Sequence, residues 1–523
     1  MAKFINSQES ISDSLLLWNT PSTQVAIEDT YGLNVWPITG TLNDGPLNFK
    51  IPPQPNGMLT DINIITKLKI QENGEDLKFR HDSLSVVNNF GNSIWEQVDI
   101  QLDDRTGITQ SMRNAYPYQT FFNHVLNSES NRVDYLYYNE LFKMDQGCTK
   151  KLEEDSRTFW DWNDAIDSEI IAAMPDTLND ETRNGKLNEM KVKLNSTENI
   201  GELYETAKYM AFAMGYSNDE SKIEQLTDIV SRLLIPSRVN PSASDRSRLL
   251  RHGESIVLYT KLQNPLFNTA KCLPTNMKIR ISLSRNSDEF LILSNGETNY
   301  NIHLEDCYLH VTYYHPRDAI LSLIEERLRK EPAPYFISRP EVIIKPVPNV
   351  GRIIRITDVF HDNLPPYAFF CLQGSKDFEG SYKTNPYTFI PFQKFQFSVN
   401  GRPYFPDPLE VTTIKKRGKG HYQYTEFGAY LRQLYKTIGK DLRGNCLIDS
   451  SNFHLNFMVG MSFSADKSNT STRHLNLQEK ASTYLEIDVG INDGTPQDMI
   501  LIIYALNNTQ IQIDSNRKIT IIE

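Results

Sequence analysis

The sequence predicts an all-β protein built from two successive β domains. Short segments in which apolar and polar residues alternate occur in two sets, as expected of strands with one buried face. The first set includes residues 277–283 and 307–313, and the second includes 395–399, 453–459 and 485–489. A charged, helix-like segment separates the sets, and no catalytic motif accompanies either one. We therefore expect two sandwiches or barrels in tandem, in a protein that works through its surfaces.

Length and composition agree with this interpretation. A chain of 523 residues and 60.2 kDa is long enough for roughly two to four domains with full cores. The net charge of -11 argues against a protein that coats nucleic acid through its overall field, although a local basic face stays possible. The 25 tyrosines and 25 phenylalanines suit strands and broad contacts between subunits.

The cysteines indicate neither disulfides nor metal. Their number is odd and no CxxC pair occurs, so we expect buried, reduced thiols rather than a disulfide framework or a zinc knuckle. The five are Cys148, Cys272, Cys307, Cys371 and Cys446. Residues 1–14 are polar, and no run approaches the roughly 18 apolar residues of a membrane span. We expect neither a secretory signal nor a membrane helix.

The first β domain is expected over residues 25–315, after an N-terminal arm at 1–24 that carries the apolar patch Leu15–Trp18. Such an arm is ordered only where it docks on something. Strands are expected at four further alternating segments before the set ends at Tyr314. These segments are residues 47–51, 62–70, 98–102 and 256–262.

An acidic helical insertion interrupts this domain at about residues 145–247. Apolar residues recur there at helical spacing over 200–214 and 223–234, which predicts a helical hairpin. Residues 151–240 hold 18 Asp and Glu against 10 Lys and Arg, so most of the net charge of the chain lies here. A segment so charged is expected to project into solvent.

A linker helix over 316–335 separates the two domains. Pro316 suits its start, Asp318 its positive N-terminal end, and the basic residues 327–330 its C-terminal end. Prolines 332, 334, 340, 346 and 348 follow, which is typical of edge strands and extended linkers.

The second β domain is expected over residues 336–523. Asn400–Gly401 predicts a type I′ hairpin turn, because both residues accept positive φ angles. A helix is expected at about 422–438, a further turn at 492–494, and closing strands at 499–506 and 511–513. No internal repeat is visible residue by residue, so any symmetry between the halves is architectural.

Three segments suggest binding chemistry, and each has a simpler interpretation that we favour. The basic run 415–421 suits phosphate binding or nuclear import, but it also fits a solvated loop. Asp161, Asp164 and Asp167 share a helical face, without the histidines or the glycine of a metal loop. Residues 488–498 resemble a calcium loop, but Asp493 occupies the glycine position, which favours a hairpin.

Enzyme motifs are missing from the sequence. The ten histidines are dispersed, and no HExxH, GxSxG, GxGxxG or P-loop pattern occurs. Paired glycosidase carboxylates can come from distant strands and leave no local spacing, so an enzyme stays open as an alternative. We expect no catalytic residue, no cofactor and no metal ligand. Without a secretory signal, the sequons are not expected to be glycosylated; they are Asn195, Asn469 and Asn507.

Several segments resemble, in order, the double jelly-roll major capsid proteins of Polinton/Maverick elements and adintoviruses. In the first half these are residues 21–27, 97–102, 114–118, 264–266 and 277–285, and in the second half 380–389, 397–401 and 504–518. The resemblance spans nearly the whole chain. The acidic insertion departs from it, since it is longer than the connection in many relatives.

The resemblance implies two tandem jelly rolls in each chain and three chains in a pseudo-hexagonal homotrimeric capsomer. Such capsomers would tile an icosahedral shell around a DNA genome, in a virion assembled inside the host cell. Implied partners are neighbouring trimers, penton and minor or cement proteins, and DNA or a membrane inside the shell. Contacts within the trimer are expected from the arm before residue 24, the helix at 318–330 and the loops at 401–421, with the insertion as an exterior turret.

Two alternatives belong to other classes. One is a carbohydrate-binding or glycoside-processing β-sandwich, which would gather carboxylates and aromatic side chains in one cleft. The other is a minor capsid or spike protein, which would share the virion without forming the trimeric double jelly roll.

Overall fold

The computed structural model describes most of both β domains. The described residues are 23–43, 45–77, 84–102, 106–107, 114–128, 132–145, 241–250, 253–294, 300–347, 353–360, 363–382, 385–411, 427–439, 446–450, 452–453, 455–464, 479–489 and 498–522. The predicted helical hairpin at 200–234, the turn at 492–494 and nearly all of the N-terminal arm lie outside them.

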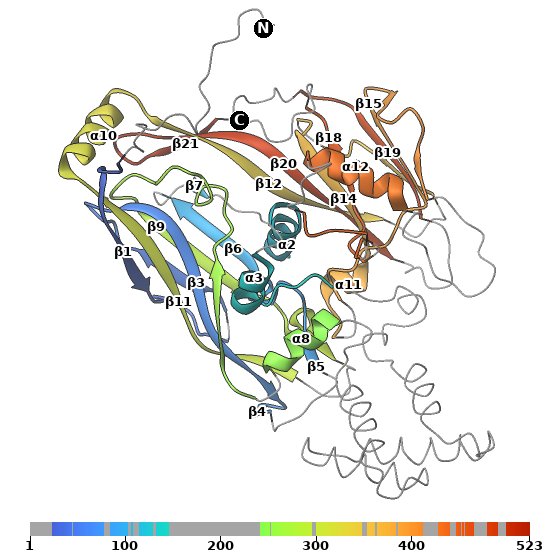
Figure 1. Ribbon diagram of the computed structural model, residues 1–523, viewed down its shortest axis with the longest axis horizontal. Coiled ribbons are helices and arrows are strands. Elements are labelled where there is room, and N and C mark those ends of the chain that lie inside the picture. The colour runs from blue at the N-terminus through green and yellow to red at the C-terminus, as the bar shows by residue number, and fades with distance from the viewer. Residues whose placement is uncertain are drawn as a thin grey trace, which may run out of the picture.

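The first half contains two facing antiparallel sheets (Figure 1). The larger sheet has the order β1 (Ile27–Val35), β11 (Tyr300–Pro316), β3 (Met58–Glu72) and β8 (Ile256–Lys261), with β4 (Glu75–Asp76) at the end of β3. The smaller sheet has the order β2 (Leu47–Ile51), β9 (Ile279–Arg285), β6 (Trp95–Leu102) and β7 (Thr106–Gly107). A separate ribbon pairs β5 (Leu84–Val86) with β10 (Ile292–Ser294).

The second half repeats this strand order. Its larger sheet runs β12 (Ala333–Val347), β20 (Met499–Ile513), β14 (Tyr367–Gly374) and β18 (Val459–Ser462), with β21 (Ile519–Ile522) on β20. Its smaller sheet runs β13 (Ile353–Thr357), β19 (Thr483–Asp488) and β15 (Lys394–Val399), and β16 (Arg402–Pro403) and β17 (Leu409–Glu410) both pair with β15. In each half the first strand pairs with the long closing strand, which pairs with the third. This is jelly-roll topology twice over, in open sandwiches rather than closed barrels, and it confirms the predicted fold class.

The two larger sheets are buried differently. Along β11, buried and half-buried residues alternate, because one face lines the core and the other is open. Residues 499–505 of β20 and nearly all of β14 are buried without alternation, because both faces are covered. One continuous cluster of buried apolar side chains extends through both halves.

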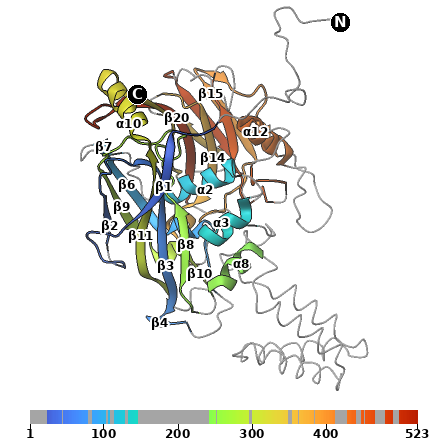
Figure 2. The same cartoon turned by 60° about the vertical axis from the view of Figure 1, so that its left-hand side comes forward.

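Helices fill the space between and around the sheets (Figures 1 and 2). They are α1 (Phe90–Ser93), α2 (Ala115–Asn127), α3 (Val133–Glu140), α8 (Pro241–Leu250), α9 (Asp288–Leu291), α10 (Asp318–Lys330), α11 (Ser375–Glu379) and α12 (Gly428–Ile438). The predicted linker helix is confirmed as α10, and the described part of the predicted helix at 422–438 as α12. Among the described residues, no helix has the length and apolarity needed to cross a membrane.

One strand prediction in the second half is wrong, and another divides a single strand in two. The described residues of 453–458 form turns, and β18 begins only at Val459. Phe453 and Phe457 are buried because they pack on each other, with ring centroids 5.2 Å apart, so the alternation reflects an aromatic turn. The segments 499–506 and 511–513 form one strand, since the polar residues between them continue the pairing with β12.

Two other features agree with predictions from the sequence, an edge strand and a hairpin turn. β12 pairs only with β20 within its sheet, and it accommodates Pro334, Pro340 and Pro346 as the edge strand that the prolines predict. Asn400 and Gly401 both have positive φ, at 50° and 75°, and connect β15 to β16 as the predicted hairpin.

Candidate functional site

The features that the described residues bring together are surfaces, an internal seam and a hollow. Within the described ranges, no group of three or more His, Cys, Asp or Glu side chains is arranged to hold a metal ion. The basic run 415–421 and the carboxylates of 161–167 lie outside those ranges. Asn507 is half-buried, and its Nδ2 donates a hydrogen bond to Glu341 Oε2 at 3.0 Å.

The seam between the two jelly rolls is aromatic and centres on α2 (Figures 1 and 2). Phe121 stacks on Tyr387 with ring centroids 4.4 Å apart, and Phe122 stacks on Tyr504 at 5.1 Å and on Phe389 at 5.8 Å. All five rings are buried. Since α2 belongs to the first half and its ring partners to the second, this packing fixes the two sandwiches against each other.

Buried hydrogen bonds across the seam help to fix the relative orientation of the two halves. Tyr118 Oη donates to Gln373 Oε1 at 2.8 Å, Ser93 Oγ lies 2.6 Å from Tyr387 Oη, and Asn114 Nδ2 donates to the Phe378 carbonyl at 3.1 Å. Burial raises the pKa of the Tyr118 and Tyr387 hydroxyls, so both stay protonated and hydrogen-bonded at ordinary pH. The seam therefore specifies one relative orientation of the halves.

A buried clasp joins the two ends of the insertion, and we use this name for the contacts of Asp145 and Arg246. Arg246 Nη2 donates to Asp145 Oδ1 at 2.8 Å, and its Nε donates to the Val86 carbonyl at 3.0 Å. The Arg246 side chain is 0% exposed. Asn385 of the second half donates to Asp145 Oδ2 at 2.9 Å. The clasp thus anchors the base of the insertion to both jelly rolls.

The chain leaves and returns at adjacent points beside the clasp. Ser242 Oγ donates to the Met144 carbonyl at 2.7 Å, and Lys143 forms an ion pair with Asp245. The insertion therefore begins and ends at one narrow stem, in agreement with a projecting element. Residues 151–240, for which solvent exposure is predicted, lie outside the described residues.

A buried contact between a histidine and a glutamate connects α2 to α3. His124 Nε2 lies 2.7 Å from Glu140 Oε2, which also accepts a 2.7 Å hydrogen bond from Asn92 Nδ2. His124 and Glu140 are both buried. The contact belongs to the packing of these helices around Asn92, whose Oδ1 also accepts a hydrogen bond from Tyr116 Oη at 3.4 Å.

The linker helix α10 lies at the outer margin of the molecule, with one face held and one face open (Figure 1). Glu325 forms an ion pair with Arg517, whose Nε donates to the Thr275 carbonyl at 2.6 Å. These contacts attach the helix to both halves. Leu323 is 60% exposed and points away from them.

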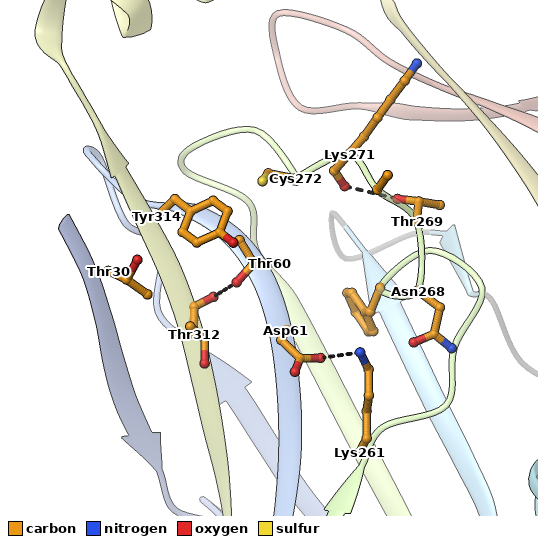
Figure 3. Close-up of a pocket in the computed structure, with 12 residues that line it drawn as sticks. Thr30, Thr60, Asp61, Lys261, Asn268, Thr269, Lys271, Cys272, Thr312 and Tyr314 are labelled. Carbon is orange, nitrogen blue, oxygen red and sulfur yellow. Dashed lines mark hydrogen bonds and ion pairs between the residues drawn. The ribbon is translucent and has the colours of Figure 1, made fainter. Parts of the chain in front are cut away.

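A polar hollow of about 560 Å³ lies on the outer side of the larger sheet of the first half (Figure 3). Strands β1, β11, β3 and β8 form its floor, and the loop at 267–272 forms one wall. Lys261 Nζ lies 3.2 Å from Asp61 Oδ1, and Thr60 Oγ1 donates to the Thr312 carbonyl at 3.0 Å. The Lys271 ammonium is held by the Pro334 carbonyl at 2.8 Å. The hollow is lined by hydroxyl groups and paired charges. Its lining does not place a nucleophilic side chain beside a general base.

Sequence reasoning missed the helix at the seam and the clasp. Residues 114–118 enter the sequence analysis only through the family resemblance, with no helix predicted there, whereas Ala115 begins α2. The apolar spacing of Tyr118, Phe121, Phe122 and Val125 fits a helix and was a usable signal. For the clasp no signal exists, because Asp145 and Arg246 are 101 residues apart.

Comparison with solved structures shows what this arrangement is similar to. A chain in the cryo-EM structure of the Sputnik virophage has a TM-score of 0.53 at 10% identity, covering 99% of this chain and 93% of that chain. The mavirus major capsid protein has a TM-score of 0.50 at 8% identity, covering 100% and 96%. The Faustovirus major capsid protein has a TM-score of 0.53 at 8% identity, covering 95% and 92%.

No protein-family model matches the chain, and no curated protein sequence matches it. Because the identities are 10% or lower, the likeness to solved structures shows the fold. That fold is the double jelly roll, shared over nearly the whole length of both chains in each comparison.

Proposed function

We propose that this protein is a viral major capsid protein that forms homotrimeric, pseudo-hexagonal capsomers. The observation that carries the proposal is the extent of the likeness, because both jelly rolls and their connection match the mavirus and Faustovirus major capsid proteins together. A protein that shared only a single sandwich with them would not match over nearly its full length. In this proposal the capsomers tile an icosahedral shell around a DNA genome, and the protein has no enzymatic role.

The seam supports this function physically. Six sandwiches form a closed ring only if the two sandwiches of each chain keep a fixed angle, and the buried aromatic packing of α2 supplies that rigidity. Contacts that repeat head to tail around a threefold axis close into a ring, whereas a flexible pair would give open chains.

We assign roles to the remaining surfaces on the same basis. Trimer contacts come from the arm before residue 24, from α10 and from the loops at 401–421, and the insertion forms an exterior turret on its stem. Partners are neighbouring trimers, penton proteins and minor or cement proteins, with packaged DNA or a membrane on the inner side. The protein resides in the virion and assembles inside the host cell.

The test is the mass of the purified protein in solution, measured by light scattering at several concentrations and salt strengths. We expect a stable species near three times 60.2 kDa. A strict monomer under every condition contradicts the proposal. Copy number per particle then separates a major capsid protein, present in most capsomers, from a minor capsid or spike protein.

A further inference from the structure

The outer face of the larger sheet of the first half carries an exposed aromatic row. Strand register places Tyr308 opposite Ile65, and Ile65 opposite Tyr259, on the same face. Trp36, directly after β1, stacks on Tyr308 with ring centroids 5.6 Å apart. Trp36 is 56% exposed and Tyr259 is 50% exposed, while Ile65 between them is only 3% exposed. Exposed aromatic clusters of this kind typically mark protein interfaces.

The polar groups on this face are already paired with each other. Lys67 Nζ lies 2.9 Å from Glu305 Oε2, and Lys261 pairs with Asp61 in the hollow. His310 Nδ1 lies 2.7 Å from Asn34 Oδ1. Covering a paired charge costs less than covering an unpaired one, because each ion keeps a partner after water leaves. The face is therefore suited to burial against another protein surface.

The equivalent face in the second half is covered within the chain. There the outer side of β12 and β20 packs against α2, and Phe122 stacks on Tyr504. So the larger sheet of the second half rests on the first half. The larger sheet of the first half has no such cover among the described residues, and its aromatic row is left open.

We propose that the second half of a neighbouring copy of this chain docks over the aromatic row and the adjacent hollow. The proposal rests on the proposed capsomer, in which halves alternate around a ring. Each first half then has two second halves as neighbours, one in its own chain and one in the next. The seam accounts for the first contact. The remaining contact needs an uncovered face on the first half, and the paired charges and exposed rings of this sheet fit it.

The first experiment places a charge in the row. Trp36→Glu and Tyr259→Glu change exposed side chains, so circular dichroism should show unchanged folding. Loss of a central aromatic contact should raise the concentration at half-assembly by roughly thirtyfold or more. The control is Tyr138→Glu, since Tyr138 is an exposed tyrosine on helix α3 and does not belong to a strand of this sheet. Its light-scattering mass should match that of the unmodified chain.

The outcomes separate this inference from the proposed function. If the unmodified chain is trimeric and both row variants assemble equally well, the docking face is wrong and the capsomer stands. If the unmodified chain is monomeric throughout, the proposed function itself fails.

Cross-linking of a mixed ¹⁴N and ¹⁵N sample identifies the occupant. Links between chains from Lys67 or Lys261 to lysines beyond residue 336 support the second half of a neighbouring copy. Links from these residues only to Lys3 instead identify the N-terminal arm as the occupant and overturn the inference. Links confined to an added minor protein would overturn it as well.

Discussion

Replacement of Arg246 by methionine tests whether the clasp holds the base of the insertion. Methionine keeps the length of the side chain but removes its charge and its donors. The variant loses the hydrogen bonds to Val86, Lys143 and Asp145, at 3.0, 3.1 and 2.8 Å. Asp145 then stays buried without its charged partner, while the neutral amide of Asn385 still donates to it.

The expected cost follows from the loss of that charged partner in a buried site. Removing one partner of a buried ion pair costs about 3–5 kcal/mol, because the other partner stays desolvated. With an unfolding entropy of roughly 2.1 cal/mol/K per residue, cooperative unfolding of this chain gives a lowering of Tm by about 3–5 °C. The double variant Arg246→Met/Asp145→Asn also removes the charge of Asp145 and should recover part of the lost free energy of unfolding.

Differential scanning calorimetry at neutral pH measures these shifts. The matched control is Arg327→Met, since Arg327 forms an exposed pair with Glu331 on α10 and should contribute less than about 1 kcal/mol. A Tm of Arg246→Met within 1 °C of the control would refute the reasoning. A double variant that is no more stable than the single one would also refute it, because the loss would then not come from the buried charge of Asp145.

Three further predictions follow from the same structure. Replacing residues 146–240 by a short Gly-Ser linker should leave a folded protein with at most a small change in Tm, because the stem already holds the two ends together; aggregation with loss of secondary structure would contradict this. Phe122→Ala should cost about 3–5 kcal/mol by calorimetry, whereas Phe336→Ala at a half-exposed position should cost far less; equal losses would show that α2 is not packed as described. Burial raises the pKa of the Cys307 thiol to about 12 and that of Cys371 well above its usual range, so Ellman's reagent at pH 8 should modify both only after unfolding, and rapid modification of the native protein would contradict their burial.

The sequence predicted best those elements whose periodicity is decided locally. Strands such as β9 and β19 alternate because one face meets the core, and α10 has Asp318 in its first turn and basic residues in its last. Each of these features is visible within about ten residues. Two β domains in tandem followed from such segments, and the jelly-roll class followed from the family resemblance.

The features that were missed depend on contacts between distant segments. β14 is a run of apolar residues covered on both faces, so it lacks the alternation that identifies a half-buried strand. Residues 453–458 alternate but pack as a turn, because Phe453, Phe457 and Phe427 form their own aromatic cluster. The seam and the clasp exist only once the two halves meet, so their residues carry no pattern of their own.

The contrast between the two larger sheets also explains why the two halves of the chain share a fold without a sequence repeat. Residues 499–505 of β20 are apolar throughout, because α2 covers their outer face as soon as the chain folds. Residues 301–311 of β11 occupy the equivalent position and alternate strictly apart from one bulge, so their outer face stays compatible with water. If that face is covered only when a second copy docks, it must stay compatible with water in the free chain. Its exposed aromatic rings are then limited to a narrow row, because a larger apolar patch would cause aggregation. If the proposed docking is correct, the polarity of each sheet reflects when its outer face is buried, during folding in the second half and during assembly in the first.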